Sequence, residues 1–155
     1  MAVPSVGKKV PDFSLPATGG ETVRLSELRG APVVLYFYPR DDTPGCTLEG
    51  QDFRDQARAL RALKATVLGV SRDTLASHEK FKAKHELNFS LLSDGEEKLC
   101  QLFGVIKDKN MYGRKVRGIE RSTFLIDADG VLRREWRGVK VKGHVAEVLE
   151  SLRQL

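Results

Sequence analysis

Residues 31–38 form an almost unbroken apolar run, Ala-Pro-Val-Val-Leu-Tyr-Phe-Tyr. A run of this length without polar alternation is typical of a strand that is buried on both faces of a sheet. Such a strand needs a packed layer above it and another below it. The run therefore predicts an α/β sandwich built around a central sheet.

The rest of the chain supplies the other elements of that sandwich. Segments 13–16 and 21–25 flank Thr18-Gly19-Gly20 and predict an N-terminal β-hairpin. A helical pattern lies within 47–65, and a second buried strand is predicted at 66–70. A second hairpin is expected at 122–137. Further helices are expected after Asp73 or Thr74, from Ser93 to Phe103, and along Val145, Val148, Leu149 and Leu152.

This order of elements predicts a thioredoxin-like fold, with a central mixed β-sheet flanked by helices. No linker or internal repeat is visible, so residues 1–155 are expected to form a single domain. Open α/β sheets place their functional sites at the carboxyl ends of central strands. The loop that follows residues 31–38 is therefore the first place to look for chemistry.

The charge of the chain is positive but dispersed. There are 26 Lys and Arg against 21 Asp and Glu, for a net charge of +5. Because the two signs interleave, we expect no nucleic-acid partner. The densest basic stretch, Lys107 to Arg117, is interpreted as a solvated loop, with a docking surface for an acidic partner as the alternative.

The location of the protein is inferred from its hydropathy and its cysteines. No apolar run reaches the ~18 residues of a membrane helix, so no membrane partner is expected. The first ten residues, MAVPSVGKKV, lack the apolar core of a signal peptide. With only two cysteines, we expect a cytoplasmic protein whose thiols are reduced.

Cys46 stands in a loop bent by Pro39, Pro44 and Gly45, at the expected start of a helix. A helix N-terminus carries a partial positive charge and unpaired backbone N–H groups, both of which favour a thiolate. The neighbours of Cys46 are small or polar and make a poor core environment. We therefore predict an exposed, reactive thiol.

Other cysteine chemistries fit less well. A Cys-x-x-Cys pair is excluded, because Thr43 and Glu49 stand three positions away on either side. Zinc binding or papain-like hydrolysis would need suitably placed histidines. His78, His85 and His144 lie far along the chain in helical patterns and are predicted to be surface residues. No metal and no organic cofactor is expected.

The spacing Pro39-x-x-x-Thr43-x-x-Cys46 resembles the active-site motif of the peroxiredoxins. The longer string FYPRDDTPGCTLEG is similar to the bacterioferritin comigratory protein branch, or Q type. Similarity extends through PDFSLP, LGVSRD, LLSDGEEKLCQLFGV and GIERSTFLIDADG, and so covers nearly the whole chain. The resemblance implies a thioredoxin-like fold and a thioredoxin-dependent peroxidase that reduces hydrogen peroxide and organic hydroperoxides.

The resemblance also implies residue roles. Cys46 would attack the peroxide and become a sulfenic acid. Arg121 would hold the thiolate and the peroxide. The charge that develops as the O–O bond stretches calls for donors, and the Thr43 hydroxyl, the Arg121 guanidinium and loop N–H groups are the candidates. Pro39 would shield the sulfur. Gly45 would support the loop. Glu49 resembles a supporting carboxylate of the family, although an exposed acid in the first helical turn is the alternative.

To complete a catalytic cycle, the sulfenic acid must be reduced back to a thiol. Many members of the branch carry a second cysteine five residues after the first, where this chain has Gln51, or in the stretch corresponding to 78–82, which has none. Cys100 is interpreted as a buried structural thiol, with resolution of Cys46 as the alternative. We prefer a one-cysteine cycle, in which thioredoxin, glutaredoxin or a small thiol reduces Cys46.

A redox sensor that passes oxidation from Cys46 to a client protein is the alternative to a peroxidase. The resemblance implies a monomer, because members of this branch are often monomeric, and no apolar stripe is apparent beyond what the core requires.

Overall fold

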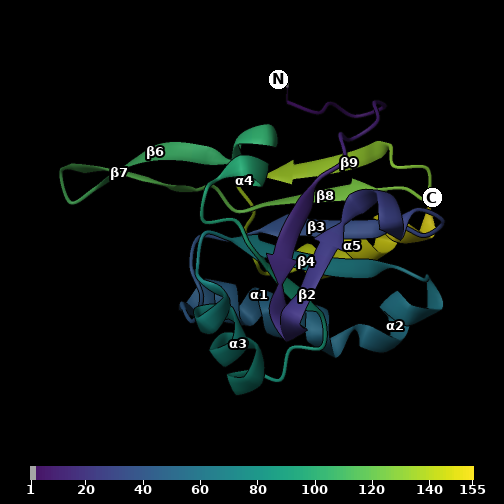
Figure 1. Cartoon of the computed structure of the whole chain (residues 1–155), viewed down its shortest axis with the longest axis horizontal. Coiled ribbons are helices and arrows are strands. Elements are labelled where there is room, and N and C mark those ends of the chain that lie inside the picture. The colour runs from purple at the N-terminus through teal and green to yellow at the C-terminus, as the bar shows by residue number, and fades with distance from the viewer. Residues whose placement is uncertain (1–2) are drawn as a thin grey trace.

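A computed structural model describes residues 3–155, which build a seven-stranded mixed sheet with helices on both sides (Figure 1). The strand order is β2-β1-β5-β4-β3-β8-β9. The strands of this sheet are β1 (Ser14–Ala17), β2 (Glu21–Arg24), β3 (Val33–Phe37), β4 (Thr66–Ser71), β5 (Ser90–Ser93), β8 (Ser122–Ile126) and β9 (Leu132–Arg137). The helices are α1 (Pro44–Asp55), α2 (Ala57–Ala62), α3 (Leu75–Lys84), α4 (Lys98–Leu102) and α5 (His144–Arg153). A separate two-stranded sheet consists of β6 (Ile106–Met111) and β7 (Arg114–Ile119).

Strand β3 lies inside the sheet, between parallel β4 and antiparallel β8. All five of its residues are buried, as the apolar run predicts. Because side chains alternate along a strand, Leu35 and Phe37 enter one core whereas Val34 and Tyr36 enter the other. The sheet therefore separates two hydrophobic cores.

Helices α1, α2, α3 and α5 all cover the same face of the sheet. Phe53 of α1, Leu60 of α2, Phe81 of α3 and Val148 of α5 all pack in the core that contains Tyr36. The core on the other face contains residues of α4 together with the N-terminal segment and β1. This two-sided arrangement is the central mixed sheet flanked by helices that the sequence predicts.

Several elements differ in detail from their predicted form. The N-terminal hairpin is present, and its turn is a short 3₁₀ segment, Thr18–Gly20. The helix expected within 47–65 begins three residues earlier, at Pro44, and breaks at Gln56 into α1 and α2. Strand β5, which pairs with β4 and β1, has no counterpart in the predicted order.

The interpretation of Lys107 to Arg117 as a solvated loop is wrong. These residues form most of a regular antiparallel hairpin, with Ile106 paired to Ile119 at its base and Met111 paired to Arg114 near its tip. In Figure 1 this hairpin projects away from the body of the molecule. The sequence showed no apolar and polar alternation typical of strands, because both faces of this hairpin carry polar residues. Within residues 3–155, no helix has the length and apolar character needed to cross a membrane.

Candidate active site

The loop after β3 delivers Cys46 to the first turn of α1. Tyr38 still donates its backbone N–H to Val70 O (3.0 Å), so the chain leaves the sheet in a fixed position. Thr43 is the N-cap residue, and Pro44 occupies the first helical position, where its missing N–H costs no hydrogen bond. Cys46 therefore lies among the unpaired N–H groups of a helix N-terminus, as predicted.

Arg121 reaches this thiol from the short connection between β7 and β8. Its Nη2 donates to Cys46 Sγ at 3.3 Å, and its Nη1 donates to Glu49 Oε1 at 2.7 Å. Residue 45 is glycine, and a Cβ there would lie 3.0 Å from Arg121 Nη2, so a larger residue would press on the guanidinium and shift it. Residues 75 positions apart are thus brought together by the pairing of Phe37 with Ser122.

Glu49 is completely buried, so its interpretation as an exposed acid in the first helical turn is wrong. Burial raises the pKa of its carboxyl to about 7, although the charge and hydrogen bond of Arg121 act in the opposite direction. Its Oε2 has no hydrogen-bond partner among the described residues, and neither has the hydroxyl of Tyr36. The pKa of Tyr36 is raised by burial first and then by the negative charges of Glu49 and Cys46.

Thr43 and Pro39 lie on the same loop. The Thr43 hydroxyl donates to Arg40 O at 3.1 Å, which commits its hydrogen to the loop. In this arrangement the hydroxyl cannot also donate to a peroxide oxygen, as the sequence led us to expect, but its oxygen retains lone pairs and can accept a hydrogen bond from a bound molecule. Pro39 is partly buried at the end of the central strand.

The prediction of an exposed thiol at Cys46 is wrong, because the residue is only 1% exposed. It packs with the aromatic and aliphatic side chains of the core beneath α1, α2, α3 and α5. The sequence around it looked polar, but Gly45 and Thr47 are only partly buried and Cys46 faces inward. Only a small oxidant could approach such a sulfur without movement of the loop.

Cys100 lies on the opposite side of the sheet. It is fully buried and belongs to the core that contains Leu35 and Phe37, whereas Cys46 belongs to the core that contains Tyr36. Burial raises the pKa of the Cys100 thiol far above its usual range, and the carboxylate of Asp94 adds to the effect. A disulfide requires Cα atoms within about 7 Å. The central sheet stands between the two thiols, both of which are free.

Two histidines expected on the surface are buried. His144 is 4% exposed, and burial lowers its pKa to about 4. His78 is fully buried on α3, with Nδ1 2.7 Å from Asp41 Oδ2 and Nε2 2.9 Å from Leu92 O. Asp41 also accepts from the Tyr38 hydroxyl at 2.6 Å. These contacts tie the Cys46 loop to α3, and no local sequence pattern pointed to them.

Asp41, Asp73 and His78 are close enough to suggest a metal site. Their polar atoms, however, already form hydrogen bonds with one another and with the loop that carries Cys46. The backbone N–H of Asp41 and the hydroxyl of Ser71 both donate to Asp73 Oδ2, at 2.9 and 2.5 Å. The hydroxyl of Ser77 also donates to Asp41 Oδ2, at 2.8 Å. The cluster is best described as a hydrogen-bonded support for the loop.

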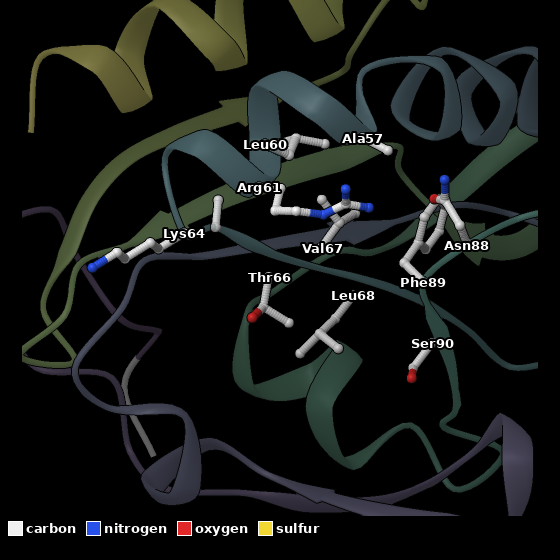
Figure 2. Close-up of a pocket in the computed structure, with 11 residues that line it drawn as sticks. Ala57, Leu60, Arg61, Lys64, Thr66, Val67, Leu68, Asn88, Phe89 and Ser90 are labelled. Atoms are coloured by element: carbon white, nitrogen blue, oxygen red, sulfur yellow. The ribbon is translucent and has the colours of Figure 1, made fainter.

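A cavity lies between α2 and the amino-terminal ends of β4 and β5, and Figure 2 shows the residues that line it. Its volume is about 550 Å³. Leu60, Arg61, Val67 and Phe89 are among its lining residues. None of the candidate site residues lines it. Cys46 follows the carboxyl end of β3, so this cavity lies at the other end of the sheet.

A reduced cysteine at the start of a helix, held by a distant arginine on a thioredoxin-like sheet, is the arrangement of a cysteine-dependent peroxidase. Comparison with known proteins gives the same class. The AhpC/TSA family model matches residues 6–135. The chain therefore belongs to the AhpC/TSA family, in its bacterioferritin comigratory protein or Q branch, and is a peroxiredoxin.

Individual relatives match along almost their entire length. Peroxiredoxin Bcp of Bacillus subtilis is 53% identical over 150 residues, covering 97% of this chain and 96% of the relative. The structure of a Xylella fastidiosa PrxQ mutant is 42% identical with a TM-score of 0.94, covering 99% and 98% of the two chains. The Xanthomonas campestris bacterioferritin comigratory protein, trapped as intermediate and ligand complexes that concern its alkyl peroxide reduction activity, is 48% identical with a TM-score of 0.88, covering 92% and 90%.

Proposed function

We propose that this peroxiredoxin reduces hydrogen peroxide and organic hydroperoxides by a one-cysteine cycle centred on Cys46. The thiolate sulfur attacks one peroxide oxygen, an S–O bond forms and the O–O bond breaks. The other oxygen leaves as water or alcohol after it takes up a proton. The sulfur is thereby oxidised to a sulfenic acid, and the peroxide is reduced.

The residues around Cys46 have complementary roles in this step. Arg121, 3.3 Å from the sulfur, stabilises the thiolate and the charge that develops as the O–O bond stretches. Thr43 accepts the hydrogen of the peroxide, because its own hydrogen is bound to Arg40 O. Glu49 holds Arg121 in place through the 2.7 Å ion pair. Gly45 leaves room for the guanidinium, and Pro39 limits access to bulk water.

The observation that carries the one-cysteine cycle is the position of Cys100 in the opposite core of the sheet. An external thiol must then attack the sulfenic acid, with release of water, and a second thiol must free Cys46 as the mixed disulfide is reduced. Thioredoxin, glutaredoxin and small thiols are the candidate reductants. Two free thiols suit the reducing cytoplasm, where these reductants are found. We propose a monomer as the working unit.

Steady-state turnover tests this function. Hydrogen peroxide consumption should be catalytic with the thioredoxin system, the glutaredoxin system or dithiothreitol, and should be lost in Cys46→Ser. Retention of full turnover in Cys46→Ser would contradict the proposal. A single stoichiometric oxidation without turnover by any of these thiols would favour the sensor alternative, in which Cys46 passes oxidation to a client protein.

A further inference from the structure

The hairpin of β6 and β7, residues 106–119, carries an unusual concentration of positive charge. It has five basic residues and one acidic residue, for a net charge of +4. In an antiparallel pair, directly opposed residues share a face, and so do alternate residues along each strand. The pairings Lys107–Gly118 and Lys109–Val116 therefore place Lys107, Lys109 and Arg114 on one face, without an acidic residue. This set of three is called the cationic face below.

Packing does not account for the length of the hairpin. Its base residue Ile119 is fully buried, but the described side chains from Lys107 to Arg117 are all exposed. An element that buries so little apolar surface adds little to stability. Lysines also protect strand edges from aggregation, yet a shorter edge would serve that purpose equally well. At the tip, Tyr112 is fully exposed, and exposed tyrosines often anchor protein interfaces.

The hairpin is anchored to the body rather than hanging as a loop. Arg117 and Arg72 both donate to Glu97 Oε2, and Arg72 also donates to the backbone O of Arg117. These arginines hold the pKa of the Glu97 carboxyl at about 2. The anchorage fixes the direction in which the cationic face points.

The base of the hairpin lies next to the catalytic cysteine. Strand β7 ends at Ile119, and Arg121, two residues later, contacts Cys46 Sγ. The hairpin therefore rises from the same end of the sheet as Cys46, whereas α2 lies at the other end (Figure 1). A macromolecule drawn to the cationic face arrives at the edge from which Cys46 must be reduced.

We propose that the cationic face is a docking surface for the protein thiol that reduces Cys46, and that this reductant presents an acidic surface beside its own cysteine. The proposal rests on the proposed function, which requires an external thiol. Opposite charges on two partners raise association rates by about 10–10³-fold at low salt. A nucleic acid would also be attracted, but it has no thiol and no part in the cycle.

The test uses three ten-residue peptides, each with one cysteine, of net charge about −4, 0 and +4. The full-length protein is oxidised with one equivalent of hydrogen peroxide and mixed with each peptide, and the rate of mixed-disulfide formation is followed by quenched mass spectrometry. For each target we compare the rate of the acidic peptide with the rate of the basic peptide. This acidic-to-basic rate ratio should be at least about tenfold higher with the oxidised protein than with analogues of free cysteine sulfenic acid. Salt at about 1 M should abolish this preference.

Matched variants separate the hairpin from overall charge. Lys107→Glu/Arg114→Glu should lose the preference for the acidic peptide, whereas Arg58→Glu/Arg61→Glu, the same charge change on α2, should keep it. The rate of oxidation by uncharged hydrogen peroxide should be the same in all three proteins. Using the same peptide on each protein cancels differences in peptide thiol reactivity.

Equal peptide rates in the wild type, or equal losses in both variants, would overturn the docking proposal while leaving the peroxidase function intact. Salt-sensitive binding of duplex DNA that depends on Lys107 and Arg114, without a peptide preference, would overturn it in favour of a nucleic-acid partner. Failure of peroxide to oxidise Cys46, or of every thiol to reduce it, would instead refute the proposed function.

Discussion

Replacement of Arg121 by glutamine tests the geometry of the site most sharply. The substitution removes a positive charge 3.3 Å from Cys46 Sγ and the partner of Glu49 Oε1 at 2.7 Å. At an effective dielectric constant of about 20, opposite unit charges at that first distance attract by about 5 kcal/mol, an upper limit for the loss. Removal of one preorganised donor from an enzyme site typically costs about 2.7–4 kcal/mol. We therefore expect the second-order rate constant with hydrogen peroxide to fall by about 10²–10³-fold.

The same substitution should have a separate effect on folding. Without Arg121, the buried carboxyl of Glu49 has neither oxygen paired, so its pKa should rise further above 7 and the group should be protonated at neutral pH. A buried, unpaired polar group costs about 1–3 kcal/mol. The double variant Arg121→Gln/Glu49→Gln should recover part of this stability without recovering the rate.

Stopped-flow oxidation measures the rate, and urea unfolding measures the stability. Arg137→Gln is the matched control, because Arg137 donates to the backbone O of Phe103 (2.8 Å) and has no contact with Cys46 among the described side-chain hydrogen bonds. It should lose stability with little change in rate. A loss of less than about threefold in a folded Arg121→Gln protein would refute the assigned role of this arginine.

Four further outcomes are expected. Because the Glu49 pKa is raised from 4.5 to about 7, the folded state binds the Glu49 proton more tightly than the unfolded state does. This proton binding stabilises the fold fully below about pH 4.5, and about 3 kcal/mol of the free energy of unfolding is lost as the pH rises to about 7. Glu49→Gln should flatten that pH dependence in urea unfolding. Gly45→Ala should slow peroxide oxidation about tenfold with little loss of stability, since its Cβ would push on Arg121 Nη2. Cys100→Ala should leave the peroxide rate unchanged and cost about 1 kcal/mol by urea unfolding, so a slower rate would give Cys100 a place in the cycle. His78→Asn should destabilise the protein by about 1–3 kcal/mol by thermal and urea unfolding, because it breaks the buried hydrogen bond with Asp41, and a neutral effect would show that the loop is held by other contacts.

The sequence predicts the elements whose burial is regular. The run at 31–38 identified the central strand, because a strand buried on both faces has no polar alternation to obscure it. The spacing of Thr43 and Cys46 located the candidate loop, because those residues lie on one short segment. The approach of Arg121, 75 positions away, followed from resemblance, since local pattern carries no record of which strands pair.

The errors on buried polar residues have a physical origin in tertiary contacts. Residues His78 and Glu49 are polar, and polar residues on helices are usually exposed, but here Asp41 and Arg121 supply the partners that permit their burial. Strand β5 was missed because its only buried residues are the adjacent Leu91 and Leu92, which give little strand pattern, and β6 and β7 were missed because most of their described side chains are exposed and polar. The burial of His78 and Glu49 depends on contacts between distant segments, which local sequence does not record.

The central claim is that Cys46 alone is oxidised and waits for an external thiol. Intact mass after one equivalent of hydrogen peroxide, measured with the wild type and Cys100→Ser, tests it most directly. The account predicts that both proteins gain one oxygen atom, as a sulfenic acid or its trapped adduct, because the sheet separates the two thiols. A loss of two hydrogen atoms in the wild type that disappears in Cys100→Ser would show an internal disulfide and contradict the one-cysteine cycle.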